Sequence, residues 1–401
     1  MIAEGRDIVI GGGPAGLACA AVLKRRGRNP VVLERAPRVG ESWRTRYDCL
    51  RLNTARWWSS LPGFPIPRNL GTWVGAGDYA NYLDLYARRH ELDVRLGLDV
   101  SRISKREPWW LVETSAGTIE AENVVVATGY DREPFLPDWP GLSGFSGQMM
   151  HASAYRNPDM FAGRRVLVVG AGNSAADIAV DLVRGGAARV WMSIRTPPQI
   201  VPRTVGGLPM QTVAVATRAL PAWVGDSIVR AAQKLVHGDL TRHGLPSPRE
   251  TVSTQFRRGD VVPVIDVEFV RRLRAGELEA VAAVREFEGD RVVLADGSQV
   301  SPEAVVAATG YRRGLEGLVG DLGVLDARGL PVTGAPESDL RGLYFAGFTN
   351  PLSGNLRELG IHARQIADQI AKSRLAVQER GWQRVDLGGT QRQAANSDRQ
   401  F

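Results

Sequence analysis

Cysteine, histidine and long apolar runs are scarce in this chain of 401 residues. The two cysteines, Cys19 and Cys49, are too few and too widely spaced for a disulfide scaffold, a CxxC redox pair or a thiolate metal cluster. The five histidines lack metal-ligand spacings such as HxxxH or HExxH, so we expect no bound metal. No stretch approaches the roughly 18 uncharged apolar residues of a membrane span, so we expect no membrane partner.

The composition is that of a globular protein, because 44% of the residues are apolar and 23% are charged. The formal net charge is +7, but the basic residues are scattered and form no run that could track a phosphate backbone, so nucleic acid is not an expected partner. The first seven residues lead into an expected strand without the basic segment and cleavage site of a signal peptide, which predicts a cytoplasmic enzyme. The length predicts two or three domains.

A glycine-rich loop follows the first apolar strand, at residues 7–10, and precedes a helix. In this loop Gly11 permits a tight turn, Gly13 lets the backbone approach a phosphate, and Gly16 lets the helix pack closely on the strand. The next apolar strand ends in Glu34, eighteen positions after Gly16, where a carboxylate can bind the ribose hydroxyls. This order of strand, loop, helix, strand and acid predicts a dinucleotide site with the pyrophosphate at the helix N-terminus.

The same pattern returns at residues 165–169, an apolar strand that runs into the motif GAGNSA at 170–175. Eighteen positions after this motif stands Ser193 rather than an acid, and Arg195 and Thr196 follow. A carboxylate would repel a 2′-phosphate, whereas a guanidinium and a hydroxyl can bind one, so this second site is predicted to take NADPH. The alternative for Arg195 is a solvated charge at the end of a strand.

Both modules close in the same way, with an apolar strand that ends in the letters ATGY at 127–130 and at 308–311. A hairpin-like stretch precedes each closure, at 109–120 and at 291–300. The repeat is therefore architectural and extends beyond the glycine loops.

The segment from Phe145 to Tyr155 lies between the two modules and matches the pattern FxGxxxHxxxY. Placed between two dinucleotide motifs, this pattern resembles the fingerprint of class B flavin-dependent monooxygenases. The chain is most similar to the YUCCA-like branch of the flavin-containing monooxygenases, in residues 46–52, 263–267 and 344–349. The resemblance covers about residues 5–375.

The resemblance implies an α/β fold with two Rossmann-like dinucleotide-binding domains, in which the NADPH domain is inserted into the FAD domain. The expected domains are the first part of the FAD domain at 1–150, the NADPH domain at 151–312 with a helical insertion at about 205–259, the second part of the FAD domain at 313–379, and a disordered tail at 380–401.

The resemblance also implies an oxygenation cycle, in which NADPH reduces FAD and oxygen then adds at flavin C4a to give a (hydro)peroxide. That adduct passes one oxygen atom to the substrate. The residues expected to bind FAD are Gly11, Gly12, Gly13, Pro14, Ala15, Gly16, Glu34, Arg35, Ser42, Trp43, Thr54, Thr128 and Gly129. Those expected to bind NADPH are Gly170, Gly172, Asn173, Ser174, Ala175, Arg195 and Thr196.

Asn53 is the expected catalytic residue, because it stands six residues after Tyr47, as does an asparagine near the flavin in the flavin-containing monooxygenase branch. YUCCA proteins carry a different residue there, and the alternative is an asparagine in a turn before Thr54. Trp43 resembles the aromatic residue beside the isoalloxazine, with core packing as an equal alternative. His151 is expected to couple the two domains rather than to act as a general base.

The leading hypothesis is thus an FAD- and NADPH-dependent monooxygenase whose partners are O2 and a small organic substrate, either a 2-oxo acid, a ketone, or a nitrogen or sulfur compound. An oxidase or reductase that uses the same cofactors is one alternative, and a non-catalytic redox-sensing flavoprotein is another, because intact phosphate loops indicate binding rather than turnover. The sequence leaves the substrate and the oligomeric state open, a homodimer included.

Overall fold

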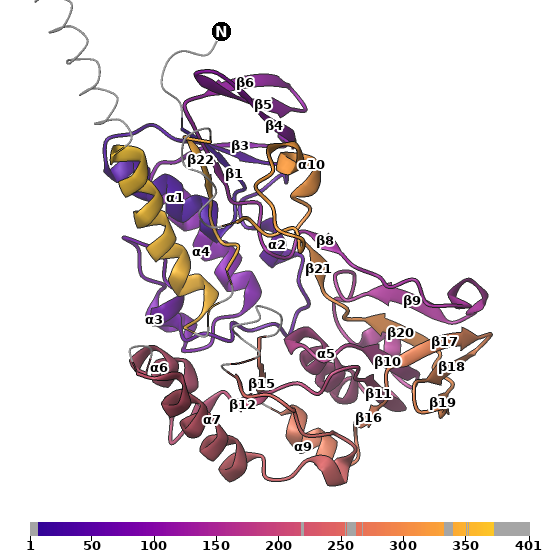
Figure 1. Ribbon diagram of the computed structural model, residues 1–401. Coiled ribbons are helices and arrows are strands. Elements are labelled where there is room, and N and C mark those ends of the chain that lie inside the picture. The colour runs from indigo at the N-terminus through magenta and orange to yellow at the C-terminus, as the bar shows by residue number, and fades with distance from the viewer. Residues whose placement is uncertain are drawn as a thin grey trace, which may run out of the picture.

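The computed structural model describes residues 7–372, apart from 218–219, 253, 255–261, 267, 333–339, 350 and 352. The tail expected at 380–401 lies outside the described residues. Two five-stranded sheets, each with its own helices, form the two halves of the molecule in Figure 1. None of the described helices is long and apolar enough to cross a membrane.

The first sheet has the order β22-β7-β1-β2-β3, and all its pairings are parallel. Both faces of this sheet are apolar, and successive side chains of each strand point alternately to one face and the other. Ile8 and Ile10 of β1 face a core shared with β4, β5 and α10, whereas Val9 faces α1 and α4. The strands are β1 (Asp7–Ile10), β2 (Val31–Glu34), β3 (Asp93–Leu96), β7 (Asn123–Val126) and β22 (Leu343–Phe345).

The second sheet repeats this design with the order β16-β11-β10-β20-β9, again with parallel pairings. Val166 and Val168 of β10 pack against α5 and α9, and Leu167 and Val169 pack against the antiparallel sheet of β17, β18 and β19. The strands are β9 (Gln148–His151), β10 (Arg165–Val169), β11 (Arg189–Ser193), β16 (Glu279–Val281) and β20 (Ala304–Ala307).

The hairpins predicted at 109–120 and 291–300 are confirmed. The elements that cover the first sheet are α1 (Pro14–Arg25), α2 (Glu41–Arg44), α3 (Arg56–Ser59), η1 (Arg68–Leu70), α4 (Ala76–Arg89), β4 (Val100–Arg106), β5 (Trp109–Thr114), β6 (Gly117–Ala121), α10 (Glu316–Val319), η5 (Gly320–Leu322) and a helix at 355–372. Those around the second sheet are η2 (Leu142–Gly144), η3 (Asp159–Phe161), α5 (Asn173–Arg184), α9 (Phe269–Arg274), β17 (Val284–Glu288), β18 (Arg291–Leu294) and β19 (Gln299–Val300).

The expected insertion, taken with the strands that flank it, includes the helices α6 and α7 among its described elements, and Figure 1 shows both below the first sheet. Its elements are β12 (Ile200–Pro202), β13 (Thr204–Val205), β14 (Leu208–Pro209), α6 (Met210–Ala216), α7 (Ala222–Val236), η4 (Thr241–His243) and β15 (Val264–Asp266). Strand β12 pairs with β15 and anchors the insertion at both ends. Helix α6 thereby reaches the segment that contains Asn53.

The chain passes between the two sheets through β8 (Glu133–Pro134) and β21 (Tyr311–Arg312), which pair with each other. Strand β9 spans the expected boundary at 150/151 and pairs with β20 inside the second sheet. We therefore propose the β8–β21 pair as the division between the two domains.

Candidate active site

The loop after β1 forms an open cradle at the N-terminus of α1. Gly11 has φ +116°, and a Cβ placed on it would lie 2.4 Å from the carbonyl oxygen of Ala127. A Cβ on Gly16 would lie 1.9 Å from the carbonyl oxygen of Gly11, so both positions require glycine. A Cβ on Gly13 would meet no protein atom within 4 Å, which leaves the helix N-terminus open to a phosphate.

The acid at the end of β2 lies against this cradle. The carboxylate of Glu34 accepts hydrogen bonds from the backbone N–H groups of Gly12 and Ala36. On the other side of β1, two residues after the end of β7, the hydroxyl oxygen of Thr128 is buried without a hydrogen-bond partner among the described residues. A glycine cradle, a fixed carboxylate and a buried polar atom without a partner together fit a dinucleotide such as FAD.

The other residues expected at the FAD site differ in exposure. Arg35 and Ser42 are exposed, and Gly129 has φ +95° with open space at its Cβ position. Trp43 is half-buried and packs edge-on against Tyr79, with ring centroids 4.8 Å apart. Trp43 therefore packs on α4, and its approach to the isoalloxazine stays a prediction.

The second loop reproduces the geometry of the first. Gly170 has φ +142°, and a Cβ on it would lie 2.3 Å from the carbonyl oxygen of Ala308, while Gly172 faces open space. Ala175 is buried where the first loop has Gly16. The side chain of Asn173 binds the backbone of β15 and its neighbour Pro263, so only its backbone faces a ligand. The cradle thus fits a second pyrophosphate.

The strand that follows this loop positions the expected 2′-phosphate site. Ser193 is buried at the end of β11, where its hydroxyl donates to the carbonyl oxygen of Ala282 and accepts from the N–H of Val284. Arg195 and Thr196, two and three residues further, are exposed. The structure therefore leaves both side chains accessible to an anion.

Asn53 is half-buried and contacts the insertion. Its side-chain oxygen accepts a hydrogen bond of 3.1 Å from Nη2 of Arg203, whose guanidinium also lies 4.8 Å from the ring centroid of Trp73. Thr54 shares a hydrogen bond of 2.7 Å with Ser59. The structure thus brings a cation to the expected catalytic residue, a contact that the sequence analysis missed.

Gln211 of α6 is a second residue that the sequence analysis missed. Its side-chain oxygen accepts from the N–H of Ala55 at 2.9 Å, and its amide nitrogen donates to the carbonyl oxygen of Ser353 at 2.7 Å. One side chain therefore holds the insertion against two segments of the first domain, near Ala55 and Ser353. No local motif signals it, because its partners are 156 and 142 residues away in the sequence.

Two tyrosine–aspartate pairs hold helix α5, and the first of them joins the two domains. The hydroxyl of Tyr47 donates to Asp177 at 2.9 Å, and that of Tyr155 donates to Asp181 at 2.8 Å. Burial raises the pKa of Asp177 to about 6, although the Tyr47 hydrogen bond and nearby Arg203 act in the opposite direction. The carboxyl group of Asp177 therefore titrates within the physiological range.

The fingerprint residues are explained by packing. A Cβ on Gly147 would lie 2.4 Å from the ring of Phe145. The ring nitrogens of His151 lie within hydrogen-bond distance of the Ser153 hydroxyl and the Gly310 carbonyl oxygen. Burial lowers the pKa of His151, which favours the neutral ring. These contacts lie within the second domain, beside the β8–β21 pair, and the coupling of the two domains by His151 stays a prediction.

The cysteines are not arranged for redox chemistry. Cys19 is buried, Cys49 is half-buried, and both thiols are free. Burial raises the pKa of each to about 12, so neither forms the reactive thiolate at neutral pH. No cluster of three metal-binding side chains is found in the described part of the chain.

Comparison with solved structures identifies the fold of this chain. Residues 8–204 match the model of the pyridine nucleotide-disulphide oxidoreductase family. The flavin-containing monooxygenase from Stenotrophomonas maltophilia has a TM-score of 0.68 at 23% identity, covering 91% of this chain and 99% of that chain. Cyclohexanone monooxygenase has a TM-score of 0.69 at 20% identity, covering 93% and 89%. At these identities the structural likeness establishes the two-domain Rossmann-like fold alone.

Sequence similarity decides the family. The indole-3-pyruvate monooxygenase YUCCA1 of Oryza sativa is 34% identical over 350 residues, which are 85% of this chain and 86% of that protein. The chain belongs to the YUCCA-like flavin monooxygenases. The resemblance seen in the fingerprint is thereby confirmed, and so is the class of enzyme, an oxidoreductase that uses FAD and NADPH.

Proposed function

We propose that this YUCCA-like flavin monooxygenase inserts one atom of O2 into a small 2-oxo acid, which then loses its carboxyl group as CO2. The observation that carries this choice is the guanidinium of Arg203 beside Asn53. Arginine binds carboxylates through two parallel hydrogen bonds, so it suits an acid better than a neutral ketone, an amine or a sulfide. The relative from Oryza sativa supports this choice, since it is named an indole-3-pyruvate monooxygenase and indole-3-pyruvate is a 2-oxo acid.

Each loop has a binding role in this proposal. The cradle of Gly11 to Gly16 with Glu34 holds FAD, and the loop at 170–175 with Arg195 and Thr196 holds NADPH. Bound FAD, reduced by NADPH, supplies the oxygen activation at its C4a atom. The protein keeps water from the reacting centre, because water entry would release hydrogen peroxide instead of product.

The reaction balances with one equivalent of each reactant. A 2-oxo acid, O2, NADPH and a proton give the shortened carboxylic acid, CO2, water and NADP⁺. One oxygen atom of O2 enters the new carboxylic acid and the other enters water. In this arrangement Arg203 binds the carboxylate that leaves, and Asn53 lies beside the carbonyl carbon that is attacked.

The test compares a 2-oxo acid with its methyl ester in Arg203→Gln and in Arg51→Gln. Arg51 is a matched control, because it lines the same small cavity of about 200 Å³ as Arg203 but bonds the backbone of Trp73 instead of Asn53. A lost charge-assisted hydrogen bond predicts that Arg203→Gln lowers kcat/KM for the acid by roughly 10- to 100-fold. The ester should change little in either variant.

An equal loss on acid and ester would refute Arg203 as the carboxylate-binding residue. NADPH oxidation that yields hydrogen peroxide with every 2-oxo acid tested would instead favour the oxidase alternative. Binding of both nucleotides without any NADPH oxidation would favour the redox sensor.

A further inference from the structure

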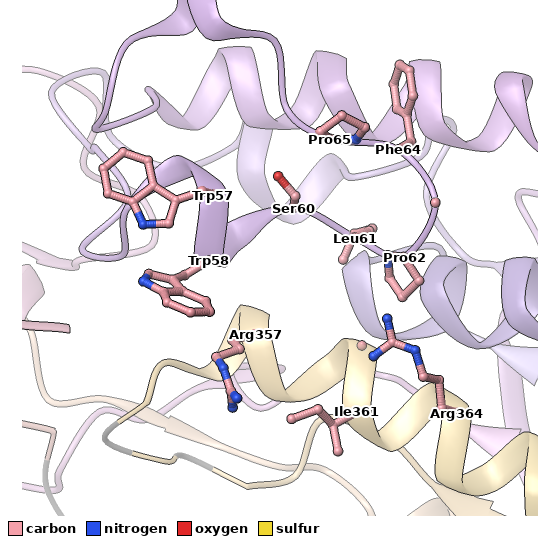
Figure 2. A pocket seen from close by; sticks show the side chains of 12 residues that line it. Trp57, Trp58, Ser60, Leu61, Pro62, Phe64, Pro65, Arg357, Ile361 and Arg364 are labelled. Atoms are coloured by element: carbon pink, nitrogen blue, oxygen red, sulfur yellow. The ribbon is translucent and has the colours of Figure 1, made fainter. Parts of the chain in front are cut away.

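A second cavity lies on the FAD domain, between the segment after α3 and the helix at 355–372. It has a volume of about 570 Å³, within the range of small-molecule pockets. Figure 2 shows its walls: Trp57, Trp58 and a proline-rich loop on one side, and Arg357, Ile361 and Arg364 of the helix on the other. None of the cofactor-binding or catalytic residues proposed above lines it.

The loop that lines this cavity is held rigidly. The hydroxyl of Tyr82 accepts from the N–H of Leu61 at 2.8 Å and donates to the carbonyl oxygen of Phe64 at 2.7 Å. Tyr86 donates to the carbonyl oxygen of Pro62 at 2.7 Å. The ring of Phe64 also stacks on Tyr82, with an interplanar angle of 3°. A preorganised wall lowers the entropic cost of binding a ligand.

The charges of the cavity favour an anion. No acidic side chain lines it among the described residues. Arg357 is paired with Glu358, which neutralises its charge, and its guanidinium lies 5.6 Å from the ring centroid of Trp58. Arg364 is exposed and has no ion pair in the described part of the chain, and in Figure 2 its guanidinium is directed toward the proline loop. The cavity therefore offers one uncompensated positive charge.

The remaining walls favour a flat aromatic body. Trp57 is 47% exposed, although a large apolar side chain gains free energy when it is covered. Indole rings bind planar aromatic groups by offset stacking. We propose that this cavity binds a planar aromatic monocarboxylate, with the ring system against Trp57 and Trp58 and the carboxylate on Arg364. This site is separate from the substrate site at Arg203.

The test measures binding of 2-naphthoate to the FAD-loaded enzyme by calorimetry, with naphthalene-2-carboxamide as the neutral probe of the same shape. All titrations use Arg203→Gln as the background, so that binding at the proposed substrate site is weakened. Arg364→Gln should raise the dissociation constant for 2-naphthoate at least tenfold, and Trp57→Leu should also raise it. Lys372→Gln is the matched control, because it removes one exposed charge from the same helix outside the cavity, and it should change the constant less than twofold.

A second experiment locates the bound ligand by photolabelling with 4-benzoylbenzoate, a photoreactive aromatic carboxylate. Labelled peptides should contain residues 57–65 or 357–364, and 2-naphthoate should reduce the labelling. The proposal is overturned if the amide binds as tightly as the acid, if Arg364→Gln and Lys372→Gln have equal effects, or if the label falls elsewhere. If the aromatic carboxylate does not bind in this cavity, the substrate proposal is unaffected. The substrate proposal is tested separately, through Arg203→Gln in an enzyme that keeps Arg364.

Discussion

Alanine substitution at two glycines of the second loop should separate NADPH binding from folding. Gly172 faces open space and has an extended backbone, with φ −93° and ψ −178°. An added methyl group clashes with no protein atom there. Alanine is a weaker helix N-cap than glycine, which lowers the free energy of unfolding by about 0.5–1 kcal/mol. Alanine also reduces the entropy of the unfolded chain, which raises the free energy of unfolding by about the same amount. The free energy of unfolding should therefore change little in Gly172→Ala.

NADPH binding should nevertheless weaken in Gly172→Ala, because the methyl group occupies the space where the pyrophosphate approaches the backbone. A displacement of about 1 Å predicts a rise of roughly 10- to 100-fold in the Michaelis constant for NADPH. Gly170→Ala should behave differently. Its φ is +142°, and its Cβ would lie 2.3 Å from a carbonyl oxygen, so the variant should lose about 2–5 kcal/mol of stability.

The assay combines thermal unfolding of the FAD-loaded protein with the dependence of flavin reduction on NADPH concentration. Gly172→Ala should keep the unfolding temperature and lose NADPH affinity, whereas Gly170→Ala should unfold at a lower temperature. The placement of NADPH at this loop is refuted if Gly172→Ala folds normally and binds NADPH as tightly as the unsubstituted enzyme.

Three further predictions concern Arg195, Asn53 and Asp177. Arg195→Ala should raise the Michaelis constant for NADPH by roughly tenfold or more and hardly change that for NADH; equal effects on both would argue against a 2′-phosphate contact. Asn53→Ala should divert NADPH-derived electrons to hydrogen peroxide, measured by a peroxide assay, and unchanged coupling would remove Asn53 from the site. The pKa of Asp177 is raised to about 6, so its protonated form stabilises the fold at low pH and that contribution is lost as the pH rises from about 4 through 6. Asp177→Asn should therefore gain stability relative to the unsubstituted protein by about 3 kcal/mol at pH 7.5 and little at pH 4, in denaturant unfolding; a difference that does not depend on pH would contradict this assignment.

Local patterns were sufficient to predict the geometry of the two glycine loops. Gly11 and Gly170 occupy equivalent positions because each faces the carbonyl oxygen of the alanine that begins an ATGY closure. The strands, the hairpins and the helices after both loops follow from hydrophobic periodicity within short windows. The fingerprint residue Gly147 likewise has a local cause, its close contact with Phe145.

The contacts around Asn53 could not be predicted in this way. Arg203 lies 150 residues from Asn53 in the sequence, and the insertion that carries it is placed by the pairing of β12 with β15. Ser193 is a second example. The sequence shows only that Ser193 stands where a ribose-binding acid would be, whereas in the structure its hydroxyl donates a hydrogen bond to the carbonyl oxygen of Ala282 and so joins β11 to that segment. Long-range polar contacts depend on tertiary geometry that periodicity does not encode.

The most direct test of the proposed function is a reaction of the FAD-loaded enzyme with NADPH, a 2-oxo acid and ¹⁸O2 in unlabelled water, followed by mass spectrometry of the products. The account predicts one ¹⁸O atom in the shortened carboxylic acid, together with one equivalent of CO2 per NADPH oxidised. A product acid without ¹⁸O, or NADPH oxidation matched by hydrogen peroxide alone for every 2-oxo acid tested, would contradict it.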